Sequence, residues 1–468
     1  MKRLNLLFKH ETIALSPNSF NSDSSSATAI LKMVCQGLLK IGPDGQLAPD
    51  LATHWAVSPD RRAYRFQLDP AARFHTGRPC DAQAVAWNFE RILDGRADSL
   101  LRHDYDGLEA VRVLDRHSVE FRLAHPNIAF LHNLAWRTHI VDDTYDQPAG
   151  TGPFRLGQWA RGSHVLLKRF DGYRVPGQPK ADELVIRYAP AAAERIDIIR
   201  RGEADIVESV PADAVGELER SGLLHTQAAP SRHRSVVYFN CRQAPFDNPL
   251  VRFAVAHAID RQALVRQAAG PSGQAIDGIL DPDDPWAIQV APIAHDPDRA
   301  RALLREAGHG GGLRIQVATT RTAPFPAVAQ LIQRDLAAVG IELQVAAYDD
   351  PPWWPYMYLK GGWQMAIQGT PARPHLDTLL GRELAAAGAL NAGGYANPDI
   401  DAGMLRARRA VHEPEQRAEY QAIQRIVRDE LPFFSLFSSG IWVGWRPGVR
   451  GFGAHPSGLI DASNATLD

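Results

Sequence analysis

The loop that begins at Thr370 holds the side chains with the most evident chemistry. It reads TPARPHLDTLL and follows the apolar segment WQMAI, so Arg373 and His375 come directly after an expected buried strand. A neutral imidazole offers one nitrogen to a metal ion or a hydrogen bond to a ligand. The alternative is that His375 caps the next helix or lies in solvent. Zinc and nickel sites need several ligands, so this histidine would contact a metal only when a bound chelator supplies the others.

The motifs of hydrolytic enzymes are incomplete. The tetrad HGGG at 309–312 resembles an esterase oxyanion loop, but no serine has both flanking glycines of the G-x-S-x-G nucleophile elbow. The tetrad follows an expected helix end, which favours a turn. HETIA at 10–14 lacks the second histidine of the zinc motif H-E-x-x-H. The sequence also has no Walker loop and no G-x-G-x-x-G fingerprint, so we expect no enzymatic activity.

The composition is that of an ordinary globular protein. Of 468 residues, 45% are hydrophobic and 22% charged, and the formal net charge is −2. With this balance of charges, the sequence has no excess of basic residues that would indicate nucleic-acid binding. No run of apolar residues approaches the roughly 18 that a membrane helix needs. The three cysteines, Cys35, Cys80 and Cys241, match no zinc or C-x-x-C pattern and are expected to be isolated thiols.

The N-terminus, MKRLNLLFKHE, is basic. Its apolar part is shorter than the h-region of about 7–15 residues that a signal peptide has. We therefore expect either that an export signal has been removed or that there was none. The alternation of Leu4, Leu6 and Phe8 predicts a first strand.

Hydrophobic periodicity predicts the elements that position the loop. Alternation predicts strands over 62–68 and 118–123, and Asp81 is expected to cap a helix over 81–94. The second half alternates helices and strands, which favours a parallel sheet. Its predicted elements are a helix over 295–308, capped by Asp296 with Pro297 at its start and Gly308 at its end, a strand over 313–319, a helix over 328–340, a strand over 341–348 and a helix over 415–430.

Five stretches, in this order, resemble the family 5 solute-binding proteins of ABC importers, the peptide- and nickel-binding group. The first contains the family's Leu-Ala-x-x-Trp, its Tyr-x-Phe-x-Leu strand and its Phe-x-x-Gly-x-Pro-x-x-Ala turn. The stretches are GPDGQLAPDLATHWAVSPDRRAYRFQLDPAARFHTGRPCDAQAVAWNFERIL (42–93), GTGPFRLGQW (150–159), RRGEADIV (200–207), FNCRQAPFDNPLVRFAVAHAIDRQALV (239–265) and HDPDRARALLREAG (295–308).

The resemblance implies an α/β fold, the two-lobed periplasmic-binding-protein fold of type II, with an extra subdomain inserted in lobe I. It also implies that a ligand held by both lobes stabilises a hinge-closed form, which a membrane permease recognises. The expected boundaries are 1–49 for the first part of lobe I, 50–150 for the inserted subdomain, 151–240 for the second part of lobe I, 241–435 for lobe II and 436–468 for a C-terminal return to lobe I.

The resemblance also bears on the ligand, a small peptide or a nickel or other metal chelate. Peptide-binding members usually carry an aspartate after the lobe II strand, where it pairs with the terminal amine; Arg373 stands near that place. The nickel-binding member has Asp-Pro-His there, of which Pro374 and His375 remain. The lost acid weakens the free-amine interpretation and leaves a chelate or an acidic ligand open.

Of the other candidate ligand-binding residues, Arg137 and Ser24 come from the same resemblance, and the rest come from their residue types and local sequence. Arg137 stands where a nickel-binding relative has an arginine that meets a ligand carboxylate; its alternative is a surface ion pair. Tryptophan and tyrosine side chains among the candidates would line an apolar pocket, or they would belong to the core. The remaining candidates are Trp136, Trp354 and Tyr356 among the aromatics, Ser24 in the first ligand loop, and Arg102 and His103 in a polar loop.

The expected setting is the periplasm. The partners would be the ligand and the permease of an ABC transporter, with no nucleic acid, and the protein would be a monomer. No cofactor is expected, except a metal ion as part of a bound chelate. The alternative function is a cytoplasmic ligand-sensing protein of the same fold that acts on a regulatory partner.

Overall fold

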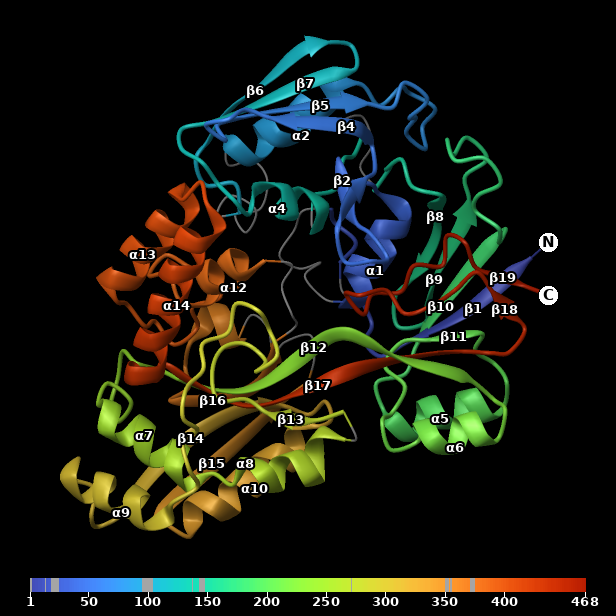
Figure 1. The fold of residues 1–468 in the computed structure, drawn as a ribbon. Helices are drawn as coiled ribbons and strands as arrows, with labels where there is room; N and C mark the ends of the chain where they lie inside the picture. The colour runs from blue at the N-terminus through green and yellow to red at the C-terminus, as the bar shows by residue number, and fades with distance from the viewer. Residues whose placement is uncertain are drawn as a thin grey trace. The chain divides into compact units, whose positions relative to one another are not determined.

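The protein is described here by a computed structural model, which divides into two compact units. Unit 1 comprises residues 1–231 and 441–468, and unit 2 comprises residues 232–440. The chain passes from one unit to the other twice, within strand β12 (His225–Phe239) and within strand β17 (Phe433–Trp445) (Figure 1). The residues that the structure describes are 2–12, 14–17, 25–94, 104–136, 138–142, 148–270, 272–349, 353, 356–370 and 375–468.

In unit 1, strand β1 (Arg3–Phe8) lies between β10 (Glu183–Tyr188) and β11 (Ile206–Val207) and is parallel to both. The strands β9 (His164–Arg169) and β8 (Phe154–Ala160) continue this sheet in antiparallel fashion. Leu4, Leu6 and Phe8 are buried, which confirms the predicted first strand.

A second sheet of unit 1 has the order β4-β5-β7-β6 and is antiparallel throughout. Its inner face carries Phe66 and Phe121, whose rings meet edge to face, with helix α2 against it (Figure 1). Asp81 caps α2 by accepting a hydrogen bond from the main-chain N–H of Ala84. The predictions for 62–68, 81–94 and 118–123 are confirmed by β5 (Ala63–Leu68), α2 (Ala82–Leu93) and β7 (Ser118–Leu123); β4 is Ala52–Val57 and β6 is Leu108–Asp115.

The stretch GTGPF packs against the end of helix α1 (Ser25–Val34). The N–H of Gly152 donates to the carbonyl oxygen of Val34 at 2.9 Å. A Cβ added at Gly150 would overlap the same carbonyl oxygen, and one at Gly152 would overlap that of Met33. Both glycines are therefore required by the close approach of two backbones.

In unit 2, β14 (Leu313–Thr320) is parallel to both β15 (Ile341–Tyr348) and β16 (Met365–Thr370), which confirms the predicted parallel sheet. β16 in turn pairs antiparallel with β12. Helix α9 (Pro297–Glu306) is capped by Asp296, as predicted. Helix α10 (Phe325–Ala337) begins and ends three residues before its predicted bounds, with a proline tolerated in its first turn.

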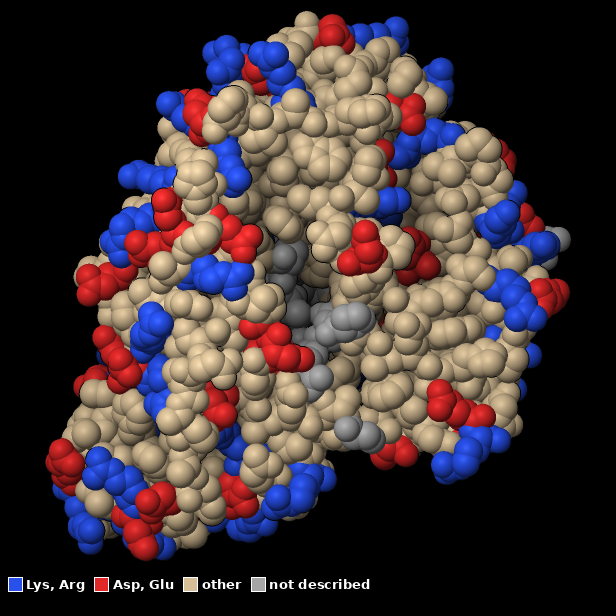
Figure 2. Space-filling model, viewed as in Figure 1, with Lys and Arg blue, Asp and Glu red and all other residues tan. Residues whose placement is uncertain are grey.

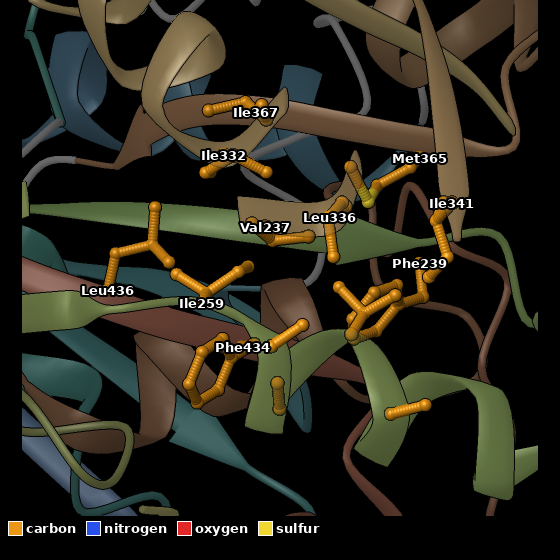
Figure 3. Packing of buried hydrophobic residues seen from close by; sticks show 14 of the residues in the cluster. Val237, Phe239, Ile259, Ile332, Leu336, Ile341, Met365, Ile367, Phe434 and Leu436 are labelled. Atoms are coloured by element: carbon orange, nitrogen blue, oxygen red, sulfur yellow. The ribbon is translucent and has the colours of Figure 1, made fainter. Parts of the chain in front are cut away.

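Both faces of β12 and β16 are buried within unit 2. On one face, Val237, Phe239, Met365 and Ile367 pack with side chains of α10 and β17 (Figure 3). On the other, Val236, Tyr238 and Ala366 pack with the helices α12 to α14. The three helices are α12 (Leu376–Glu383), α13 (Pro398–Arg409) and α14 (Glu413–Glu430), of which the last confirms the prediction for 415–430.

Shorter elements complete the two units. They are β2 (Leu39–Ile41), β3 (Leu47–Pro49), α4 (Phe130–Trp136), α5 (Ala192–Arg200), α6 (Val215–Arg220), α7 (Pro249–Ala258), α8 (Arg261–Leu264), the π-helix η2 (Val265–Ala269), β13 (Gln274–Ala275), the π-helix η3 (Tyr356–Lys360), β18 (Val449–Arg450) and β19 (Thr466–Leu467). Among the described residues, no helix is both long and apolar enough to span a membrane. The face shown in Figure 2 mixes positive and negative side chains.

Candidate ligand-binding site

The loop singled out in the sequence connects β16 to α12. β16 ends at Thr370, and His375 is the residue that caps α12. Its Nδ1 accepts a hydrogen bond from the main-chain N–H of Asp377 at 3.1 Å. The helix-capping alternative is therefore confirmed for His375, while Arg373 lies outside the described residues.

Burial and the cap together determine the charge of the His375 ring and which of its nitrogens carries the proton. Burial lowers the pKa of His375, and the charge of Asp377 only partly opposes this effect. The ring lies edge-on near Trp286 and Tyr420, with centroids 6.1 and 6.3 Å away. In a neutral ring whose Nδ1 accepts a hydrogen bond, the proton must be on Nε2. Nε2 is then a donor, and it could bind a metal ion only if the proton moved to Nδ1 and the cap were lost.

Asp377 is the centre of a buried polar network behind His375. It is 3% exposed, and its Oδ1 accepts from Nε of Arg408 and from the hydroxyl of Tyr420, each at 3.0 Å. Burial, reinforced by the charge of Asp377, raises the pKa of Tyr420 well above its usual value. The carboxylate therefore ties α12 to α13 and α14 and keeps the capped end of α12 in place.

A second polar group lies where β12 and β16 meet. Arg234 is directly opposite Thr370 in the antiparallel register, so both side chains lie on one face of the sheet. Nη2 of Arg234 donates to Oγ1 of Thr370 at 3.1 Å and to Oε2 of Glu383 at 3.0 Å. The hydroxyl of Tyr238 also donates to Oε2 of Glu383, at 3.4 Å.

Of the aromatic candidates, Tyr356 lies in unit 2, partly buried against its core beside Trp353. Tyr356 stacks on Tyr348 with ring centroids 4.3 Å apart. Trp353 is 2% exposed, and its Nε1 donates to Oε1 of Gln368 at 2.7 Å. These contacts agree with the core alternative, whereas Trp354 lies outside the described residues.

In unit 1, Trp136 ends helix α4 and packs against the core beside α1. Nζ of Lys32 lies 5.9 Å from its ring centroid and donates to the carbonyl oxygen of Ala135 at 3.0 Å. Burial lowers the pKa of Lys32 to about 8. Nε1 of Trp136 is buried and has no hydrogen-bond partner among the described residues. The candidates Ser24, Arg102, His103 and Arg137 lie outside the described residues.

Possible metal ligands among the described residues are the side chains of His, Cys, Asp and Glu. Within the described ranges, no group of three or more His, Cys, Asp or Glu side chains is placed to hold a metal ion. All three cysteines are free thiols, as predicted. Burial raises the pKa of Cys241 to about 11, so this thiol is protonated at neutral pH.

Arg234, Asp377 and Glu383 were not predicted from the sequence as polar groups of this region. One signal for Arg234 was present in the printed sequence. Residues 234, 236 and 238 alternate with 235, 237 and 239, so Arg234 continues the face of Val236 and Tyr238. An arginine in line with two buried side chains indicates a buried charge that needs a partner.

Comparison with known proteins gives one matching family. Residues 46–380 match the family model described as "Bacterial extracellular solute-binding proteins, family 5 Middle". A curated relative is the glutathione-binding protein GsiB of Shigella dysenteriae serotype 1, 28% identical over 469 residues, covering 96% of this chain and 91% of the relative.

Two solved structures show the same fold. DppA from Helicobacter pylori, in complex with the peptide STSA, has a TM-score of 0.91 at 23% identity, covering 99% of this chain and 98% of that one. NikA from Staphylococcus aureus, in complex with Ni(L-His)2, has a TM-score of 0.89 at 19% identity, with full coverage of both chains, 100% each. At these identities the likeness shows the two-lobed α/β fold and leaves the ligand open.

Proposed function

The chain belongs to family 5 of the bacterial extracellular solute-binding proteins, and we propose that it captures a small acidic organic solute for an ABC importer. The observation that carries this proposal is the span of the family match, residues 46–380, which takes in most of unit 1 before the first crossing and a large part of unit 2. Proteins of this family are the substrate-binding components of transporters and are not enzymes. This supports transport over the alternative of a cytoplasmic sensor.

For the ligand, we favour a peptide-like acid over a metal chelate. The proton on Nε2 of His375 makes this ring a hydrogen-bond donor, and a metal ion would have to displace that proton. The loop also has Arg373 where an acidic residue would serve a free amine. A guanidinium donor suits carboxylate oxygens.

The proposed mechanism is closure of the two units when the solute binds. The chain has two crossings between units, in β12 and β17, and these are where the backbone would flex. A solute stabilises the closed form only by as much as its affinity for that form exceeds its affinity for the open one. The closed form would then be the state that a membrane permease recognises, and the periplasm is the proposed location.

The test is to identify what the protein carries. Protein purified from its own host under native conditions would be analysed by mass spectrometry, and each solute found would be titrated by calorimetry. We expect an organic acid that binds with micromolar or tighter affinity and reduces the radius of gyration in solution scattering. Recovery of the protein from the cytoplasmic fraction, bound to a regulatory partner and without a solute, would contradict the proposal.

A further inference from the structure

Arg234 carries a buried donor that its neighbours leave unused. The residue is 5% exposed, and its hydrogen-bond partners Thr370 and Glu383 both accept from Nη2. Nη1 is buried and has no hydrogen-bond partner among the residues that the structure describes. A buried N–H without an acceptor is unfavourable by roughly 1–3 kcal/mol, more when the group is charged.

A second arginine of unit 2 shows what complete pairing looks like. Arg252 is also 5% exposed, and all three of its nitrogens donate to carbonyl oxygens. Nε and Nη2 bond to Glu430, and Nη1 bonds to Phe246, at distances of 2.6 to 3.0 Å. Burial of an arginine in this unit is thus compatible with full satisfaction, which Arg234 lacks.

Arg234 lies at the end of the sheet where a ligand could meet the unpaired Nη1. Along β12 and β16, the face that carries Val236 and Ala366 ends at the polar pair Arg234 and Thr370. The polar end is where β16 stops and where β12, two residues before Arg234, passes between the units. In α/β proteins, ligands bind beyond the ends of the strands, so a polar group at this end is well placed for one.

From this geometry we infer that Arg234 is a carboxylate-recognition residue, with Nη1 donating to an anionic oxygen of the bound solute. This inference rests on the proposed function and deepens it, because it specifies a carboxylate on the ligand. Glu383 holds the guanidinium through Nη2 and thereby orients Nη1, and the pair is buried, with side chains 6% and 4% exposed. Arg234 thus contacts the ligand, and Glu383 is a positioning residue.

The test compares acids with their amides in two variants. The probes are glutathione and the peptide STSA, each beside a form whose carboxyl groups are amidated, with affinities measured by calorimetry. The variant R234Q/E383Q removes both charges, which avoids stranding a buried carboxylate. The control R314Q/E342Q makes the same two changes at an exposed ion pair, with side chains 65% and 59% exposed, outside the proposed site. Circular dichroism and thermal unfolding establish that each variant is folded.

We expect the wild-type chain and R314Q/E342Q to prefer an acid over its amide, and R234Q/E383Q to lose roughly 10–100-fold in affinity for the acid alone. If the double variant retains the preference, Arg234 is not the recognition residue, while solute capture still stands. Equal binding of acid and amide by the wild-type chain overturns the inference in the same way. If neither acid binds, the inference is wrong, and the proposed function falls with it only if the purified protein also carries no solute.

Discussion

Nδ1 of His375 accepts a hydrogen bond from the main-chain N–H of Asp377 at 3.1 Å, and this bond caps helix α12. It has two consequences, one for stability and one for metal binding. Each can be measured with the same variant, His375→Asn. Asparagine is among the best capping residues, and its side chain is no imidazole.

The first prediction concerns stability. His375→Ala should lower the free energy of unfolding by about 1 kcal/mol, because α12 loses its cap. His375→Asn should lose much less, since the amide oxygen can accept the same N–H. Urea unfolding at pH 7 measures both. Equal losses for the two variants would mean that packing of the ring against Trp286 and Tyr420, and not the cap, is what matters.

The second prediction concerns metal. If the solute is an organic acid, His375→Asn should bind Ni(L-His)2 no more weakly than the wild-type chain does. If instead the histidine contacts a chelated metal, the same variant should lose on the order of 10–100-fold in affinity. Calorimetry with the nickel-loaded complex, and with histidine alone as control, separates the two results. A selective loss for the nickel complex would restore the chelate interpretation.

A third prediction concerns the buried carboxylate of Asp377. Asp377→Ala removes the buried carboxylate that accepts from Arg408 and Tyr420 and should lower the free energy of unfolding by roughly 3–5 kcal/mol. Tyr420→Phe removes one hydrogen bond and should cost about 1 kcal/mol. The matched control is the exposed pair Arg314–Glu342, with side chains 65% and 59% exposed. There Glu342→Ala should change stability by less than about 1 kcal/mol. A similar effect at both sites would contradict the network.

The fourth prediction concerns pH. Nε2 of His75 lies 3.0 Å from the carbonyl oxygen of Gly152, and the ring meets Phe170 edge to face. Burial lowers the pKa of His75 from 6.5 to about 4, with a smaller contribution from Arg155. The unfolded chain therefore binds this proton more readily, and stability is lost as the pH falls from about 6.5 toward about 4.

For His75 alone, the expected loss between pH 7 and pH 5 is about 2 kcal/mol. Urea unfolding gives the change in unfolding free energy between pH 7 and pH 5 for the wild-type chain and for His75→Gln. The difference between these two changes is the contribution of His75. Glutamine retains a donor for the carbonyl of Gly152 but does not titrate. If both proteins lose the same stability on acidification, His75 is not the group responsible.

A fifth prediction concerns the glycines beside α1. Gly152→Ala should lower the free energy of unfolding by roughly 1–3 kcal/mol, because the added methyl group overlaps main-chain atoms of Met33 and Val34. Gly311→Ala is the control, since nothing lies within 4 Å of an added Cβ there. Thermal unfolding of both variants measures the difference. A neutral Gly152→Ala would show that the two backbones can move apart at little cost.

The elements that could be predicted are those whose sequence patterns lie within or next to the element itself. Helix α9 was predicted because three residues in or next to it mark its cap, its first turn and its end. They are Asp296, Pro297 and Gly308. The parallel pairing of β14 with β15 follows from a short β-α-β succession. The predicted bounds of helix α10 are three residues too late. A proline usually indicates a helix boundary, but the first turn of a helix tolerates one.

The polar contacts of the candidate site were beyond prediction for a different reason. Arg234 and Glu383 are 149 positions apart, and Asp377 and Tyr420 are 43 apart. Such pairs are set by how α12 and α14 pack on the sheet, and no local pattern encodes that packing. For His375, the sequence allowed both a cap and a ligand contact; the distance to the N–H of Asp377 shows the cap, and the ligand contact stays a prediction.

The second crossing of the chain has a consequence for the order of folding. Residues 441–468 belong to unit 1 but are synthesised after all of unit 2. They bring the end of β17 beside β11, where Trp445 pairs with Ile206, and they add Val443 and Ile460 to the core around Leu4. Unit 2 is complete in sequence before these residues leave the ribosome, whereas unit 1 still has an open strand edge at β11. A chain that stopped at residue 440 would retain that edge, and chaperones would have to protect it from pairing with other chains.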